Sequence, residues 1–112
     1  MHVALEAGEP VTVEPRSIAD GLNAPFAGAN TLAICRELVD EMVLVSEDEI
    51  HDAFRFLYER AKLAAEPGAA AGVGALLAGK VPDVDGKTVA VVVSGGNVAG
   101  KTAAAILSSN ED

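Results

Sequence analysis

The sequence predicts an α/β fold in which helices alternate with strands of a mostly parallel sheet. Two mostly apolar runs, Met42–Val45 and Thr88–Val93, show no polar alternation, which is typical of strands buried on both faces of such a sheet. Helix signals lie between and after these runs. Together with a short strand expected over residues 11–13, they give the predicted order β-α-β-α-α-β-α. Two or three strands make a thin sheet, and we therefore expect this chain to contribute part of a larger one.

The first 28 residues are predicted to be mostly irregular. Three prolines each disfavour helix at the residue before them: Pro10, Pro15 and Pro25. A short strand is predicted over residues 11–13. The first helix is expected over residues 30–39, capped by Asn30 or Thr31, with Leu32, Cys35, Leu38 and Val39 on one apolar face.

The most clearly marked helix is expected to begin after Ser46. Ser46 and Glu49 have the spacing of a capping box, in which each side chain accepts a hydrogen bond from the other residue's backbone N–H. Apolar residues then recur at helical spacing: Ile50, Ala53, Phe54, Leu57, Tyr58, Ala61 and Ala64. Because Pro67 disfavours helix at the residue before it, we expect this helix to stop near Ala65.

The remaining sequence predicts two helices on either side of the second strand. One helix begins with Pro67 as its first residue and ends before Gly79, which suits the left-handed conformation after a helix. The strand of residues 88–93 is followed by the turn Ser94–Asn97, and the last helix is expected over residues 98–108. Ligands in open α/β sheets bind beyond the carboxyl ends of strands, so this turn is a candidate binding site; a plain strand-to-helix turn is the alternative.

Composition and charge exclude several classes of protein. The chain has 112 residues with 8 Lys+Arg against 17 Asp+Glu, and its net charge of −9 is opposite to what nucleic-acid binding requires. Cys35 is the single cysteine and cannot form an internal disulfide, and His2 and His51 lack companions at metal-ligand spacing. No apolar run reaches the ~18 residues of a membrane span, and the start does not resemble a signal peptide. We therefore expect a cytoplasmic protein without a metal site and without nucleic-acid or membrane partners.

A phosphate-binding loop is one interpretation of the turn. Residues 95–102 match the pattern G-x-x-x-x-G-K-[ST], follow a predicted strand and open a predicted helix, as that motif requires. Only ten residues follow Thr102, too few for a further strand that brings an Asp to Mg²⁺. The match therefore predicts a nucleotide-binding module, with Lys101 on the phosphates, only as an alternative.

A family resemblance accounts for more of the chain. Several segments resemble, in order and with the family's spacing, the later part of serine/threonine dehydratases: residues 18–22, 36–41, 43–50, 59–70 and 91–98. These are fold-type-II pyridoxal-phosphate enzymes, which include threonine ammonia-lyases and serine racemases. The resemblance implies that the chain is the C-terminal portion of such an enzyme, a partial three-layer sandwich. The phosphate-binding pattern is then a coincidence.

The resemblance also implies a set of residues near the cofactor. Ser94 resembles the hydroxyl that hydrogen-bonds the pyridine nitrogen of pyridoxal 5'-phosphate, and Gly95 and Gly96 complete that S-G-G-N turn. Gly21 resembles the glycine that lies close to the cofactor ring. Glu66 resembles an acidic residue at the edge of the site; an ordinary helix-start carboxylate facing the helix dipole is an equal alternative.

Two further residues match effector positions of the serine racemase branch. Asn97 and Lys62 correspond to residues that contact an activating nucleotide in that branch. For Lys62, a solvated lysine on a helix is the favoured alternative. The amino-acid substrate implied for the complete enzyme is serine or threonine.

The chain also departs from the family. The family's Schiff-base lysine lies in an S-x-K-x-R-G-type segment, and its phosphate-binding glycines form a separate run; neither matches residues of this sequence. We therefore expect residues 1–112 to be a single fragment without catalytic residues, without an ACT-type regulatory domain and, by itself, without cofactor or activity. A purely structural or assembly module is a further alternative. An unpaired edge at the strand of residues 88–93 predicts a homo-oligomer.

Overall fold

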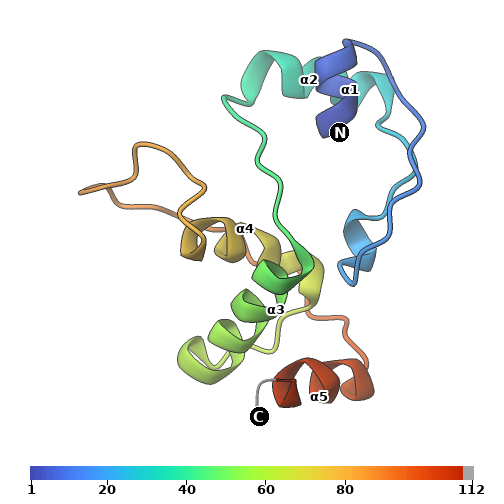
Figure 1. Ribbon diagram of the computed structural model, residues 1–112. Coiled ribbons are helices and arrows are strands. Elements are labelled where there is room, and N and C mark those ends of the chain that lie inside the picture. The colour runs from blue at the N-terminus through green and yellow to red at the C-terminus, as the bar shows by residue number, and fades with distance from the viewer. Residues whose placement is uncertain (110–112) are drawn as a thin grey trace.

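The computed structural model describes residues 1–109, which form five α-helices, a 3-10 turn and a π-helical turn (Figure 1). In chain order these are α1 (His2–Ala7), η1 (Asp20–Leu22), α2 (Ala29–Leu38), α3 (Glu47–Phe56), η2 (Leu57–Ala61), α4 (Pro67–Leu77) and α5 (Gly100–Ser108). The helices pack in two groups. α1 lies against α2, whereas α3, η2, α4 and α5 surround a second, larger core.

The predicted strands do not form within residues 1–109. Residues 11–13, 42–45 and 88–93 all lie in segments without regular secondary structure, so the expected sheet is not confirmed within the described residues. A backbone hydrogen bond from the Val13 N–H to the Pro25 carbonyl, at 2.8 Å, joins two parts of the N-terminal segment. A strand exists only when a neighbour pairs with its N–H and C=O groups, and an apolar run by itself does not supply that neighbour.

The start of α3 confirms the predicted capping box. The Ser46 hydroxyl accepts from the Glu49 N–H at 3.2 Å, and the Glu49 carboxylate accepts from the Ser46 N–H at 2.7 Å. The same carboxylate pairs with the Lys80 ammonium at 2.7 Å, and that ammonium also donates to the Leu44 carbonyl at 3.0 Å. The beginning of α3 is thus tied both to the segment before it and to the loop after α4.

The end of this helix lies earlier than predicted. α3 widens at Leu57 into the π-helical turn η2, and Lys62 then adopts a left-handed conformation with φ of 59°. The Leu63 N–H donates to the Leu57 carbonyl at 2.9 Å, which closes the widened turn. The chain therefore leaves the helix at Lys62 rather than near Ala65, and residues 62–66 run as a non-helical link into α4.

The close packing of α4 on α3 depends on small residues. As predicted, α4 starts with Pro67 and is followed by Gly79 in the left-handed conformation, with φ of 67°. A Cβ at Gly74 would lie 2.9 Å from the Glu49 carbonyl oxygen, so the two backbones meet at this glycine. The core beneath is built mainly from alanines with a few larger side chains: Ala53, Phe54, Leu57, Ala65, Ala69, Ala70, Val73 and Ile106.

The remaining helices differ in part from the prediction. The helix α1 was not expected. Gly8 follows it in the left-handed conformation, and the Gly8 N–H donates to the Ala4 carbonyl. α2 agrees in extent, but its cap is Gly28 rather than Asn30 or Thr31, and no side chain caps it. α5 begins at Gly100, two residues later than expected.

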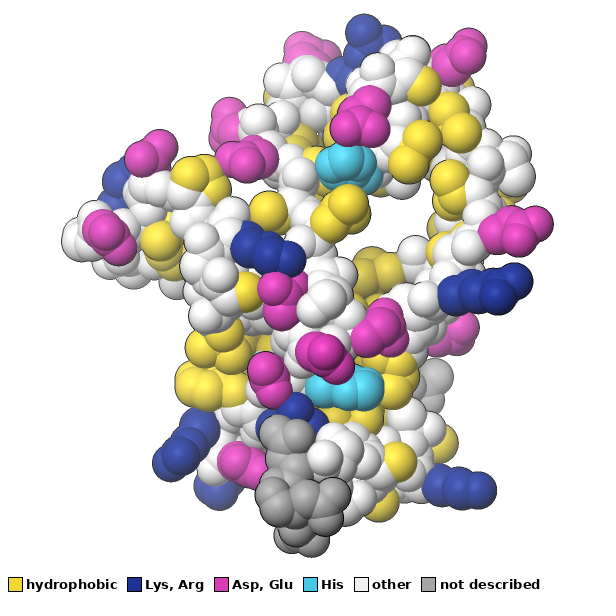
Figure 2. Space-filling model, viewed as in Figure 1, with side chains coloured by type: hydrophobic (Ala, Val, Ile, Leu, Met, Phe, Trp, Pro, Cys, Tyr) yellow, Lys and Arg dark blue, Asp and Glu magenta, His cyan; other side chains and the backbone are white. Residues whose placement is uncertain are grey.

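The molecule is more open than a compact chain of this length. Its radius of gyration is 15.0 Å, against about 13 Å for a compact domain of 100 residues. Figure 2 shows an opening between the α1–α2 group and the rest of the molecule. Large apolar side chains stay exposed on both parts, among them Val92 at 82%, Leu38 at 71% and Leu44 at 61%. Within residues 1–109 no helix combines the length and apolar character needed to cross a membrane.

Replacing Gly74 by alanine tests the α3–α4 contact. The new methyl group collides with the backbone of Glu49, which cannot rotate away, so we expect Gly74→Ala to lower the free energy of unfolding by about 1–3 kcal/mol. Urea unfolding followed by circular dichroism measures this change. Gly100→Ala is the matched control, because a Cβ there has no neighbour within 4 Å. Equal stabilities for the two variants would contradict close packing at Gly74.

The acidic start of α3 predicts a loss of stability at low pH. The Lys80 ammonium and the Ser46 N–H hold the pKa of Glu49 below its ordinary 4.5, and the Ser17 hydroxyl and the Ile18 N–H do the same for the pKa of Glu47. Because both pKa values are lower in the folded chain, this stabilisation is present above pH 4.5 and is lost as the pH falls through the lowered values.

Thermal unfolding between pH 7 and about 3 tests this dependence. The native chain should lose more stability over that range than the double variant Glu47→Gln/Glu49→Gln, which has no carboxylates to protonate at these positions. Parallel curves for the two proteins would show that the two carboxylates do not contribute.

Candidate functional site

Glu66 binds the S-G-G-N turn through both its backbone and its side chain. Its N–H donates to the Gly95 carbonyl at 2.9 Å, and its carboxylate accepts from the Asn97 N–H at 3.0 Å. Glu66 precedes α4, but its side chain makes no capping hydrogen bond to that helix. The role of an ordinary helix-start carboxylate therefore does not account for all the contacts of Glu66, because its carboxylate binds a segment 31 residues further along the chain.

Glycines allow this close contact from several directions. A Cβ at Gly95 would lie 2.6 Å from the carboxyl carbon of Glu66, and one at Gly96 would lie 2.9 Å from the Ala64 carbonyl oxygen. A Cβ at Gly21 would lie 3.4 Å from a carboxylate oxygen of Glu66. The structure thus brings Gly21, Glu66 and the turn together, although they are far apart in the sequence.

Glu66 and Gly95 each line a hollow of the structure. One has a volume of about 300 Å³ and is lined by Ile18, Asp20, Gly21, Glu66, Pro67, Gly68, Asn97, Val98, Ala99 and Thr102. The other, also about 300 Å³, is lined by Leu63, Ala64, Ala65, Val93, Ser94, Gly95 and Gly96. Ser94 is exposed there. Of the predicted cofactor residues, Gly21 and Glu66 therefore line one hollow, and Ser94, Gly95 and Gly96 line the other.

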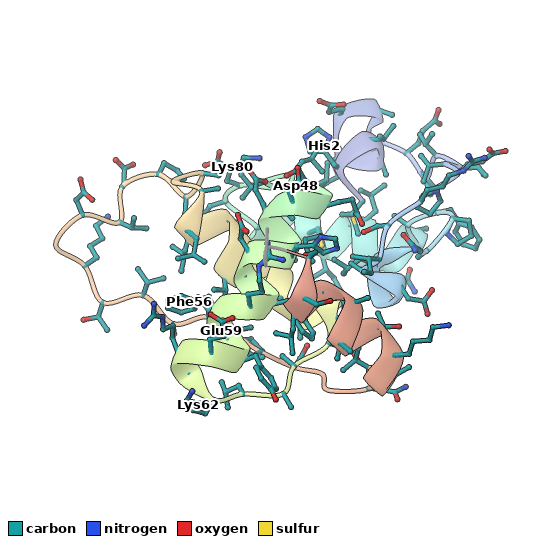
Figure 3. All side chains as sticks on the ribbon, turned by 60° about the horizontal axis from the view of Figure 1, so that its bottom comes forward. His2, Asp48, Phe56, Glu59, Lys62 and Lys80 are labelled. Atoms are coloured by element: carbon teal, nitrogen blue, oxygen red, sulfur yellow. The ribbon has the colours of Figure 1, made fainter. Side chains whose placement is uncertain are left out.

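The two predicted effector residues do not share a hollow. Asn97 lines the cavity beside Glu66, whereas Lys62 lines a separate hollow with Tyr58 and Ala64. Lys62 lies at the end of η2, away from Asp48 at the start of α3 (Figure 3). Its left-handed backbone marks where the chain turns toward Glu66.

The geometry does not favour a phosphate-binding loop. Such a loop presents free backbone N–H groups to an anion, but here the Asn97 N–H is already bonded to the Glu66 carboxylate. A second negative charge beside that carboxylate would be repelled. Lys101 is exposed on α5, and Thr102 lines the Glu66 cavity.

Several residues around the cavity were not singled out from the sequence. Ile18, Asp20 and Thr102 line it, and Glu47 holds the segment that contains the first two. Ile18 and Asp20 are close to Gly21 in the sequence, and this proximity could have indicated that they line the cavity. Glu47 gave no such signal, because an acidic residue in a first helical turn is common for dipole reasons alone.

No metal site is formed among residues 1–109, where no group of three or more His, Cys, Asp or Glu side chains is arranged to bind an ion. A further hollow, of about 570 Å³, lies on the loop after α4, at residues 79–87. It contains none of the predicted site residues.

Curated relatives resemble this chain closely. The L-threonine ammonia-lyase of Geobacter sulfurreducens is 44% identical over 110 residues, which are 95% of this chain and 26% of that protein. The L-threonine ammonia-lyase of Thermotoga maritima is 46% identical over 99 residues, which are 88% of this chain and 24% of that protein. The chain thus spans about a quarter of the length of these relatives.

A solved structure and a family profile agree with these relatives. The structure of maize serine racemase superposes with a TM-score of 0.80 at 36% identity, covering 89% of this chain and 32% of the racemase. This similarity supports the α/β class, although the described residues contain no strand. The family described as pyridoxal-phosphate dependent enzyme matches residues 1–95, so the chain belongs to this family, whose cofactor is pyridoxal phosphate.

Proposed function

We propose that this chain forms one wall of the pyridoxal-phosphate site in a serine/threonine dehydratase, a deaminating ammonia-lyase, or in a serine racemase. The observation that carries the proposal is the contact of Glu66 with the Gly95–Asn97 turn, which brings together the residues that the family resemblance places near the cofactor. The similarity to threonine ammonia-lyases and to a serine racemase supports this substrate class.

The residues of this wall fit one edge of a flat aromatic cofactor. Gly21 and Gly95 have no side chains and can therefore lie against the Glu66 carboxylate, and the exposed Ser94 hydroxyl can donate a hydrogen bond to a ring nitrogen. When bound, pyridoxal phosphate withdraws electrons from the amino-acid substrate. A neutral hydroxyl partner leaves the ring nitrogen unprotonated, which makes that withdrawal weaker than with a carboxylate partner.

Glu66 keeps the turn in place. Its carboxylate accepts a hydrogen bond from the Asn97 N–H at 3.0 Å. In the proposed site it orients the backbone that carries Ser94. The same wall serves a dehydratase and a racemase, because both need the cofactor ring held in one orientation.

The rest of the enzyme is proposed to come from polypeptide beyond these 112 residues. The Schiff-base lysine and the phosphate-binding glycines of the family match no residues here, and the chain spans about a quarter of its relatives. We propose that residues 42–45 and 88–93 become strands of a mostly parallel sheet in a three-layer sandwich when that polypeptide supplies partners. The exposed Val92 side chain and the openness of the molecule support this.

Three further properties extend the proposal. An effector nucleotide contacts Asn97 and Lys62, which line two separate hollows of this chain. The complete enzyme is a homo-oligomer, as the unpaired segment of residues 88–93 favours. It acts in the cytoplasm.

Replacing Gly95 by alanine tests the wall in the complete enzyme. The methyl group displaces the Glu66 carboxylate from the Asn97 N–H, and loss of a hydrogen bond to a charged group costs about 1.5–3 kcal/mol. We therefore expect the affinity for pyridoxal phosphate, measured by fluorescence titration, to fall on the order of tenfold or more.

Two controls make this measurement specific. Gly100→Ala should leave the affinity unchanged, because its Cβ meets nothing within 4 Å. In a Glu66→Ala background, Gly95→Ala should have little further effect, because the group it collides with is gone. Additive effects of the two substitutions would contradict the proposed contact.

Titration of the isolated chain separates the proposal from a nucleotide-binding module. We expect no binding of pyridoxal phosphate and no binding of magnesium-ATP at micromolar concentrations, because the lysine and phosphate loop are lacking and the Asn97 N–H is occupied. Isothermal calorimetry provides the measurement. Micromolar ATP binding that Lys101→Ala abolishes would favour the phosphate-loop function instead.

A further inference from the structure

The segment of residues 17–23 is a small unit with its own hydrogen bonds. The Ser17 hydroxyl accepts from the Ala19 N–H at 3.0 Å, and the Ser17 carbonyl accepts from the side-chain amide of Asn23 at 2.7 Å. The Leu22 N–H donates to the Ala19 carbonyl at 2.8 Å. These bonds give the segment a shape, but they do not fix its place against the helices.

Glu47, the first residue of α3, holds this segment. One oxygen of its carboxylate accepts from the Ser17 hydroxyl, and the other accepts from the Ile18 N–H at 2.8 Å. Hydrogen bonds to an ionised acceptor are roughly twice as strong as neutral ones, and two donors on one carboxylate fix orientation as well as distance. Ala19, next in the chain, is buried, and Ile18 packs against the core of α3, α4 and α5.

The held segment brings Gly21 to the Glu66 cavity. Ile18, Asp20 and Gly21 form one side of that cavity, and Asn97 and Thr102 lie among its other lining residues. Gly21 lies beside Glu66, since a Cβ there would be in van der Waals contact with the Glu66 carboxylate at 3.4 Å. A small movement of residues 17–23 would therefore change the width of the cavity.

We propose that Glu47 is a positioning residue for the cofactor site: its carboxylate fixes residues 17–23 so that Gly21 lies against Glu66. The identity of the ligand rests on the proposed function, whereas the placement of Gly21 is a property of this chain. Glu47 touches neither cofactor nor substrate in this role and acts through Ser17 and Ile18.

Three variants separate this role from a general effect on α3. Glu47→Ala removes both acceptor oxygens, and Glu47→Gln keeps the shape with one acceptor oxygen. Asp48→Asn is the matched control. Asp48 carries the same charge in the same helical turn, is exposed, and makes no hydrogen bond or ion pair in the part of the chain that the structure describes (Figure 3).

Hydrogen exchange in the 112-residue chain is the first measurement. We expect the amides of residues 18–23 to exchange at least tenfold faster in Glu47→Ala, because two charge-assisted bonds are lost. Glu47→Gln should show a smaller increase and Asp48→Asn none, and protection in α4 should stay native in all three. Native exchange rates at residues 18–23 in Glu47→Ala would overturn the proposal.

Cofactor affinity of the complete enzyme is the second measurement. Glu47→Ala should weaken pyridoxal-phosphate binding by about tenfold without moving the absorbance band of the bound cofactor, because Ser94 is not contacted by Glu47. Equal affinities for Glu47→Ala and Asp48→Asn would overturn the positioning role. If the native complete enzyme binds no pyridoxal phosphate, the proposed function fails, and the exchange rates alone then decide whether Glu47 fixes the segment.

Discussion

The contact between Glu66 and the Gly95–Asn97 turn is the constraint on which the site depends. A backbone N–H and a carboxylate of one residue bind both sides of the turn, so the turn has one position relative to α4. Two bonds to one residue are possible only at short range, and this explains why a Cβ at Gly95 has no room.

The position of Glu66 depends in turn on how α3 ends. The π-helical turn η2 and the left-handed Lys62 release the chain from the helix, and the short link that follows places Glu66 ahead of α4. A regular helix continued to Ala65 would carry these residues past the turn instead. π-helical turns are rare and are frequently found at functional sites.

The openness of the molecule reflects two kinds of packing surface. Between α3 and α4, small residues let the backbones meet, and the core there is closed. Around residues 88–93 only one side is packed: Val91 and Val93 lie against the core, whereas Val92 is exposed. Exposed apolar side chains on an extended backbone are typical of a strand without its neighbours, which agrees with a chain that spans about a quarter of its relatives.

The sequence by itself determined the elements whose stabilising contacts are local. The capping box of Ser46 and Glu49, and the start of α4 at Pro67, involve residues at most three apart and were predictable. Likewise, the family blocks pointed to the site residues, but not to their contacts. Only the tertiary structure decided that Glu66 binds Asn97 and that Glu47 holds Ser17, because these partners are about 30 residues apart and meet only through helix packing. The predicted strands are absent from the described residues for the same physical reason: an apolar run becomes a strand only beside another strand.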